Sequence, residues 1–197
     1  MSQARGFSLA EALMVVALFG MAAAVVAPNL GESRRTFDLH RVTRQIAQDS
    51  LRCRMEALTS YRNVGLVFAE DHGRPYYTMV IDGDGDGISR ADFLHGIDKA
   101  IGPKVWVEFL SGGTHLGVPR DWRVPDPGGQ GMLPSAGLRT GLSNIISFSE
   151  QGHATPCSVY FNDGRDRVLA VRVSGDWGRI RVLQWRRGWR EWVEVRL

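Results

Sequence analysis

The sequence predicts an α+β fold in which a long N-terminal helix packs on an antiparallel β-sheet. An apolar run and then an amphipathic pattern with helical spacing occupy residues 7–60, and short apolar runs separated by turn residues follow. One helical segment followed by a series of strands is typical of α+β proteins with an antiparallel sheet. The chain has 197 residues, 44% hydrophobic and 23% charged, which fits one globular domain and excludes collagen-like and disordered classes.

The first element is an apolar run from Phe7 to Ala27, in which Glu11 is the only charged residue. A helix of this length is long enough to cross a bilayer core. A carboxylate inside such a helix is costly unless it finds a partner. Cleavage of the chain after Gly6 would supply one, because the new α-amine on Phe7 would lie one helical turn from Glu11.

A secretory signal peptide is the alternative interpretation of this run. Ala22, Ala23 and Ala24 could provide the small residues of a cleavage site. Glu11 argues against it, because the apolar core of a signal peptide does not require a carboxylate.

The order of a short leader, Gly6, Phe7 and Glu11 resembles the prepilin signal of type IV pilins and type II secretion pseudopilins. The resemblance implies that a prepilin peptidase removes the leader peptide, residues 1–6, and methylates the Phe7 amine. It implies that Glu11 is the assembly carboxylate, which neutralises the amine of a neighbouring subunit. Pro28 matches the helix-kinking proline of the family, so residues 7–28 would form the transmembrane and assembly helix.

Residues 32–60 contain no proline or glycine and continue the helix as an amphipathic segment. The apolar positions recur at helical spacing, with Ser50 on the same stripe, and the other faces are rich in arginine. We expect this stripe to pack against the sheet. Its apolar members are Leu39, Val42, Ile46, Cys53 and Ala57.

The strands are expected where apolar runs are bounded by turn residues such as those of the segment 162–164. The expected strands are 64–68, 76–81, 105–109, 145–148, 158–161, 168–173, 179–184 and 192–195. The segment 111–141 is rich in glycine and proline, and we expect it to form a long loop or an extended edge.

The stretch 145–183 resembles the C-terminal half of the GspH/FimT-type domain, with a strand, a glycine turn, two strands and a Gly-Arg-x-Arg turn. The resemblance implies a type IV pilin-like fold whose globular domain, residues 29–197, lies in the periplasm on a single-pass helix in the bacterial inner membrane. It implies a minor pseudopilin of the H type in a type II protein secretion system. The implied partners are other pilins or pseudopilins, the prepilin peptidase and the assembly platform. The alternative is a FimT-like minor pilin of a type IV pilus that binds double-stranded DNA for uptake.

Asp82, Asp84 and Asp86 alternate with glycines and are followed by Gly87 and a hydrophobic residue. This pattern resembles the opening of an EF-hand-type calcium loop, because calcium requires several hard oxygen ligands on a flexible turn. The closing acid departs from the pattern, since Asp92 comes one residue early. The candidate calcium ligands are therefore these four aspartates, and the alternative is a solvated acidic turn.

The C-terminal segment combines arginine and tryptophan, and Lys99 and Lys104 are the only lysines of a chain with formal net charge +3. Guanidinium groups bind phosphates and exposed indoles stack on bases, so this segment is a candidate DNA-binding surface. On a strand, alternate residues of the Gly-Arg-x-Arg turn would share one face. Packing or a subunit contact is the alternative for the segment, and a GC-rich genome is the alternative for the arginine bias. The candidate DNA-binding residues are Arg179, Arg181, Arg186 and Arg187.

Cys53 and Cys157 are the only cysteines, and they lack the spacing of a zinc or redox motif. Outside the cytoplasm they could form a disulfide, and the alternative for Cys53 is a small buried apolar residue. The five histidines show no metal spacing, and the sequence contains no nucleophile triad or phosphate-binding loop. We therefore expect no enzymatic activity and no cofactor other than calcium.

Overall fold

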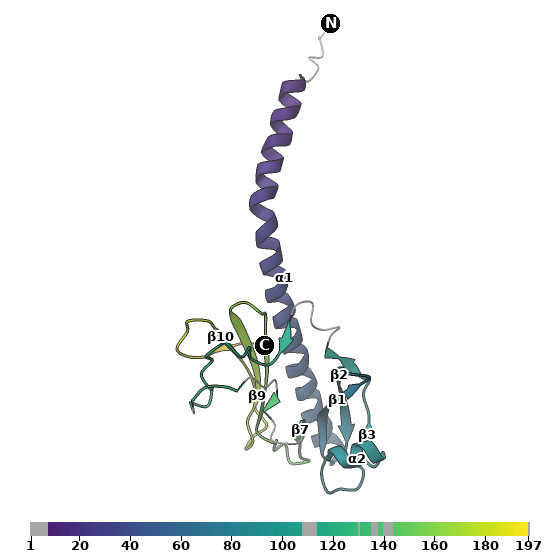
Figure 1. The fold of residues 1–197 in the computed structure, drawn as a ribbon. Coiled ribbons are helices and arrows are strands. Elements are labelled where there is room, and N and C mark those ends of the chain that lie inside the picture. The colour runs from purple at the N-terminus through teal and green to yellow at the C-terminus, as the bar shows by residue number, and fades with distance from the viewer. Residues whose placement is uncertain (1–7, 108–113, 130, 135–137, 140–143, 197) are drawn as a thin grey trace.

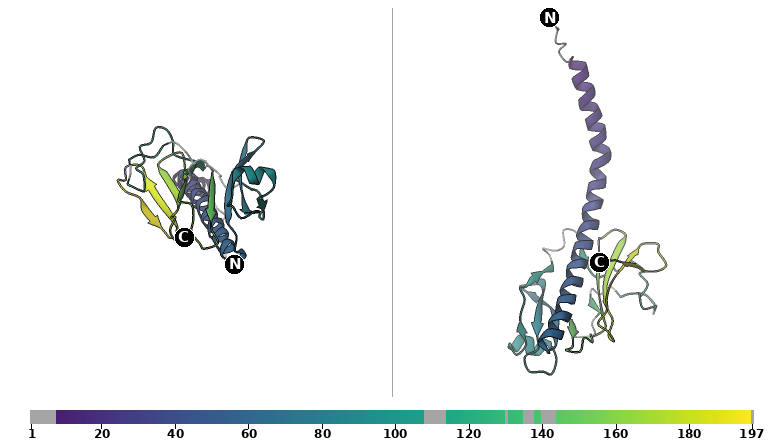
Figure 2. Two further views of the ribbon diagram at one scale, coloured as in Figure 1. Left: turned by 90° about the horizontal axis from the view of Figure 1, so that it is seen from below. Right: turned by 180° about the vertical axis from the view of Figure 1, so that it is seen from behind.

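One long helix lies between two antiparallel sheets in the computed structural model (Figure 1, Figure 2). The structure describes all residues except 1–7, 108–113, 130, 135–137, 140–143 and 197, and it describes no side chains for 23–33, 138 and 139. The helix is sandwiched between the sheets along its C-terminal half, and its N-terminal half projects away from them (Figure 1).

Helix α1 runs from Leu9 to Ser60. It begins at a capping box, in which the Ser8 side chain accepts a hydrogen bond from the Glu11 amide and the Glu11 carboxylate accepts one from the Ser8 amide. It ends at Tyr61, which adopts a left-handed conformation with φ of 56°.

The apolar stripe predicted for residues 32–60 is confirmed, because all its members are fully buried. Ser50 is buried with them, and its hydroxyl donates to the Ile46 carbonyl oxygen at 2.7 Å. The Thr43 hydroxyl donates in the same way to the Leu39 carbonyl oxygen. Both buried hydroxyls are therefore hydrogen-bonded, and neither leaves an unpaired polar group in the core.

The first sheet has the strand order β3-β2-β1-β7, and β4 also pairs with β2. A tight hairpin joins β1 and β2, with Gly73 at φ of 74° in its turn. The short helix α2, Arg90–His95, lies between β2 and β3 in the chain. The strands are β1 Val64–Asp71, β2 Arg74–Ile81, β3 Lys99–Ala100, β4 Val105–Trp106 and β7 Ile145–Phe148.

The second sheet has the order β11-β10-β9-β8-β5, and β6 also pairs with β8. All the described pairs of both sheets are antiparallel. The strands are β5 His115–Leu116, β6 Leu138–Arg139, β8 Cys157–Asn162, β9 Arg167–Val173, β10 Ile180–Arg186 and β11 Val193–Val195.

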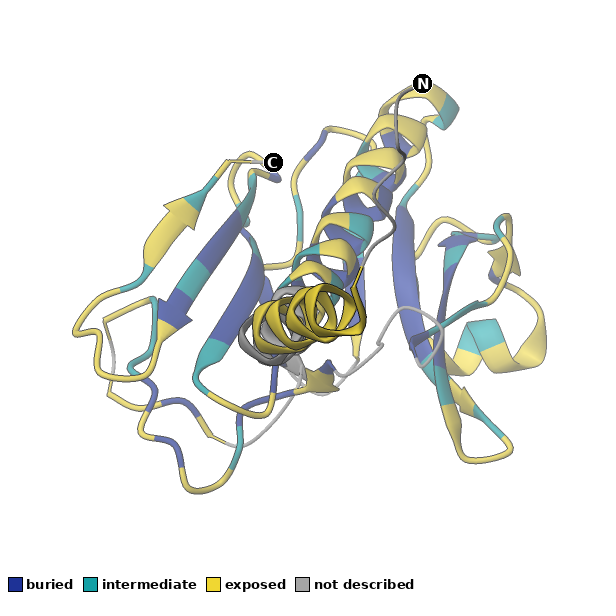
Figure 3. Cartoon of the chain, turned by 90° about the horizontal axis from the view of Figure 1, so that it is seen from above, coloured by how far each residue is buried: buried dark blue, intermediate teal, exposed yellow. Residues whose placement is uncertain are grey.

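Two principal cores follow from the alternation of side chains along the strands. The central core joins the helix stripe to both sheets, so the helix face appears buried between them in Figure 3. A second core, here called the outer core, covers the opposite face of the second sheet with residues of the segment 118–133. Its members include Trp122, Tyr160, Ala170, Leu183 and Trp185.

The expected fold class is wrong in its membrane half. Among the residues that the structure describes, no helix contains an apolar stretch long enough to span a membrane. The apolar N-terminal part of α1 with described side chains covers Leu9–Ala22, 14 residues. The predicted transmembrane helix and single-pass inner-membrane location are corrected accordingly, together with the pilin-like fold class that included them.

The expectation of one sheet also requires correction. The strands expected at 64–68, 76–81 and 145–148 pair in the first sheet, whereas those at 158–161, 168–173, 179–184 and 192–195 pair in the second. Their positions are confirmed to within a few residues. The strand expected at 105–109 is described only for Val105–Trp106.

Candidate functional site

The two sheets and the part of α1 packed between them are here called the head. The segment Leu9–Ala22 of α1 lies outside it, is here called the stem, and exposes large apolar side chains on all its sides. The exposed fraction is 81% for Leu9, 72% for Phe19 and 42% for Val15, the least exposed of them. Gly6 and Phe7, the predicted processing residues, lie outside the described residues, and Pro28 lies where side chains are not described. The stem is a surface that the head does not cover (Figure 1).

Glu11, the predicted assembly carboxylate, is fully exposed at the start of the stem. Its Oε2 atom accepts bonds from the Ser8 amide at 3.0 Å and from the Ser8 hydroxyl at 3.1 Å. These two hydrogen bonds hold the pKa of the Glu11 carboxyl below its usual value. The carboxylate is therefore ionised. It lies at the N-terminus of the helix, where a negative charge interacts favourably with the helix dipole.

The acidic loop brings together three of the four predicted calcium ligands. Carboxylate oxygens of Asp82, Asp84 and Asp86 lie within 4.8 Å of one another, and neighbouring Asp84 raises the pKa of Asp86. Asp92 is not in this group: it belongs to the first turn of α2, where its carboxylate accepts a hydrogen bond from the Ser89 hydroxyl. The inclusion of Asp92 is thus corrected, and calcium binding stays a prediction.

Both carboxylate oxygens of Asp82 hold the loop together directly. One accepts the amides of Asp84 and Gly85 at 3.2 and 2.7 Å, and the other accepts the Gly87 amide at 2.9 Å and the Asn63 side chain at 2.7 Å. Burial alone raises the pKa of Asp82, but these hydrogen bonds lower it below its usual value.

Asp98 is a residue of this loop that the sequence did not single out. It is buried, and its two oxygens accept the amides of Gly83 and Ser89, each at 3.0 Å. The carboxylate thus joins both ends of the acidic loop. Only tertiary structure shows this, because Asp98 lies beyond α2 and outside the motif.

The four predicted DNA-binding arginines have different surroundings in the structure. Arg179 lies beside α1 and approaches Glu194 at 3.7 Å, whereas Arg181 lines a pocket on the outer face of the second sheet. Arg186 forms an ion pair with Asp166. Arg187 stacks over the Trp122 ring at 5.9 Å. Arg179 and Arg181 thus line different pockets. Their common face and DNA binding stay predictions.

The glycine of the Gly-Arg-x-Arg turn has a structural role. Gly178 has φ of 54°, and a Cβ atom there would lie 2.6 Å from the Gly152 carbonyl oxygen and 3.2 Å from Arg54 Nε. Any larger residue would force this turn away from the Gly152 backbone. This close contact explains why position 178 is a glycine, and DNA binding is not needed to explain it.

The tryptophans of the C-terminal segment are divided between packing and exposure. Trp185 is buried and donates from its indole to the Trp189 carbonyl oxygen at 2.9 Å, and Trp192 donates to the Pro125 carbonyl oxygen at 2.7 Å. Trp177 is 78% exposed. Trp185 and Trp192 therefore pack in the outer core, as the packing alternative expected, whereas Trp177 and Trp189 are exposed.

Cys53 and Cys157 are free thiols in the central core, so the predicted disulfide is corrected. Burial raises the pKa of both thiols, to about 12 for Cys157, and keeps them protonated at neutral pH. They act as small apolar residues.

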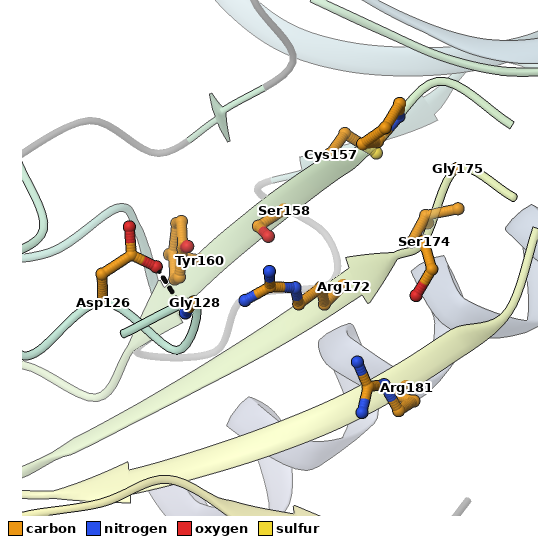
Figure 4. Close-up of a pocket in the computed structure, with 11 residues that line it drawn as sticks. Asp126, Gly128, Cys157, Ser158, Tyr160, Arg172, Ser174, Gly175 and Arg181 are labelled. Carbon is orange, nitrogen blue, oxygen red and sulfur yellow. Dashed lines mark hydrogen bonds between the residues drawn. The ribbon is translucent and has the colours of Figure 1, made fainter. Parts of the chain in front are cut away.

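The pocket that contains Arg181 has a volume of about 420 Å³ and lies over β8, β9 and β10 (Figure 4). Arg172 and Ser158 line it from the neighbouring strands, and Asp126 and Gly128 line it from the segment that covers the outer core. Arg181 belongs to the Gly-Arg-x-Arg motif, whereas no motif marks Arg172.

Comparison with known proteins gives no relative: no family model, no curated protein and no solved structure matches this chain.

Proposed function

We propose that this chain is a subunit of a pilus-like fibre, namely a minor pseudopilin of the H type in a type II secretion system, and that it assembles through the stem of α1. The observation that carries the proposal is the exposure of the stem. Leu13, Met14, Val16 and Phe19 are each more than 60% exposed on a helix that the head leaves uncovered.

Such a surface requires a partner, because apolar area left in water is unfavourable and large exposed patches mark interaction sites. The occupant that we propose is the stem of neighbouring subunits. Apolar side chains on all sides of one helix suit packing against several helices at once, as in a helical bundle. The head, held rigidly by its core, would then be displayed outside the bundle.

Glu11 gives this bundle its register in the proposal. Its carboxylate is ionised at the helix terminus, where it accepts hydrogen bonds only from Ser8 among the described residues. Removal of residues 1–6 would place an α-amine on Phe7, one turn away on the same helix. Between stacked stems, a carboxylate and an amine of neighbouring subunits would neutralise each other in apolar surroundings, where an ion pair is stronger than in water.

The experiment compares fibre incorporation of Glu11→Ala with that of the unaltered chain in cells that assemble the fibre. Total amount and N-terminal processing are measured on the same samples. We expect processing to be unchanged and the sheared fibre fraction to lose at least about nine-tenths of the subunit, a loss that corresponds to about 1.4 kcal/mol. The matched control is Glu56→Ala, an exposed glutamate of the same helix within the head. Normal incorporation of Glu11→Ala, or equal loss in the control, would refute the assembly role.

A further inference from the structure

The outer face of the second sheet carries a row of polar residues that the proposed assembly does not use. Arg172 is directly opposite Arg181 on β10 and directly opposite Ser158 on β8. Side chains directly opposite in neighbouring strands share one face about 5 Å apart. The row therefore brings two guanidinium groups and a hydroxyl together on this face (Figure 4).

Alternation along the strands places this row at the edge of the outer core. Tyr160, Ala170 and Leu183 belong to that core, and each lies two residues from one member of the row on the same strand. The loop of Asp126 and Gly128 borders the row from one side, and Ser174 and Gly175 border it at the strand ends. The result is a pocket of about 420 Å³, a size typical of small-ligand sites.

The two guanidinium groups have no partner in the described part of the chain. No ion pair or hydrogen bond joins Arg172 or Arg181 to a described side chain, and Arg181 Nε is buried without a hydrogen-bond partner. Buried donors are normally paired, so an unpaired one indicates an absent acceptor. Like charges directly opposite each other are also unfavourable in a sheet.

Asp126, the acidic residue that lines the pocket, does not neutralise the positive charge of both arginines. Asp126 Oδ1 accepts the Gly128 amide at 2.7 Å, which commits that oxygen to its own turn. A Cβ atom on Gly128 would lie 3.3 Å from Arg172 Nη2, so the loop backbone passes directly over the guanidinium and helps to enclose it. With two arginines and one aspartate, the pocket lining carries a net positive charge.

We propose that this pocket binds an oxyanion, the carboxylate or phosphate group of a small ligand, between Arg172 and Arg181. The planar fork of each guanidinium matches two oxygens of such a group, and the anion removes the repulsion between the two arginines. The Ser158 hydroxyl adds a neutral donor on the same face. This site is separate from the stem. Anion binding can therefore be tested independently of fibre assembly.

The test uses the full chain, titrated with inorganic phosphate and, separately, with succinate, at constant ionic strength set with sodium chloride. We expect a saturable rise in melting temperature with at least one anion, because a ligand of the folded state stabilises it. Arg172→Gln and Arg181→Gln should each weaken the apparent affinity about tenfold or more, as expected for the loss of charge-assisted hydrogen bonds. A response to phosphate alone assigns the site to phosphate groups, and a response to succinate alone assigns it to carboxylates.

Arg179→Gln is the matched control, because Arg179 lies on the same turn but lines a different pocket. It should bind as the unaltered chain does. NMR of the unaltered, ¹⁵N-labelled chain keeps the test valid if a variant fails to fold: the Arg181 Nε–H signal should shift with the same saturation. An unchanged signal, no saturable response to either anion, or equal responses in all three variants would overturn the proposal.

Discussion

The hydrogen bond from Tyr77 to Asp49 fastens α1 to the first sheet, and its removal should cost the fold a measurable part of its stability. The Tyr77 hydroxyl donates to Asp49 Oδ2 at 2.8 Å, and both residues are buried. Hydrogen bonds to charged groups contribute about 1.5–3 kcal/mol. Asp49 also accepts from Gln45 at 3.0 Å and from Arg52 at 3.2 Å, so its charge stays solvated by the protein when Tyr77 is removed. We therefore expect Tyr77→Phe to lower the free energy of unfolding by about 1.5–2 kcal/mol, the low end of that range.

The assay is urea unfolding of the full chain at neutral pH. Tyr76→Phe is the matched control: its ring is buried at the neighbouring position of β2, against Trp106 and near Lys104, and its hydroxyl makes no described hydrogen bond. The control should change the free energy of unfolding by less than about 0.5 kcal/mol. Equal effects of the two substitutions, or a neutral Tyr77→Phe, would refute the tether.

The pH dependence of the same pair provides a second measurement. Burial, followed by the bond to Asp49, raises the pKa of the Tyr77 hydroxyl well above its usual value. A raised pKa in the folded state contributes stability that is fully present below the unfolded pKa, about 10, and is lost as the pH rises above it. The difference in stability between the unaltered chain and Tyr77→Phe should therefore shrink above about pH 10. A difference that grows there would contradict the assigned direction.

Three further predictions follow from the candidate sites. Gly178→Ala should lower the melting temperature more than Gly188→Ala, because both have positive φ but only the first would bring a Cβ atom within 4 Å of other atoms; equal shifts would refute the close contact. The unaltered chain should lose stability as the pH falls from about 4, the pKa of an unfolded aspartate, through the lower pKa of folded Asp82, and Asp82→Asn should flatten this loss in acid unfolding curves; an unchanged acid limb would contradict the role of Asp82. The thiols of Cys53 and Cys157 should react with a thiol reagent only after denaturation, whereas rapid labelling of the native chain would contradict their burial.

Local patterns predicted the elements of the fold well. The helix stripe and the strands at 64–68, 145–148 and 168–173 follow from spacing and turn residues alone. The division into two sheets could not be predicted in this way. It depends on the pairing of β7 with β1 rather than with β8, a long-range contact that no local pattern specifies.

The candidate sites show the same limit. The motif of alternate aspartates correctly placed Asp82, Asp84 and Asp86 together, but counting along the chain could not show that Asp92 belongs to the cap of α2. The Gly-Arg-x-Arg motif marked Arg181 as a candidate binding residue. Its partner Arg172 became visible only through the register of β9 and β10.

The membrane prediction failed for a different reason. A low count of charged residues between Phe7 and Ala27 favoured a spanning helix, whereas no helix in the described part of the chain has an apolar stretch long enough to span a membrane. Hydropathy identifies apolar surface but does not identify what covers it. The same residues support the proposed packing of stems.

The most direct test of the fibre-subunit proposal is the N-terminal sequence of this chain recovered from sheared fibres. We expect a single mature species that begins at Phe7, with residues 1–6 removed. A fibre-bound chain that retains residues 1–6, or a processed chain that never enters the fibre, would contradict it.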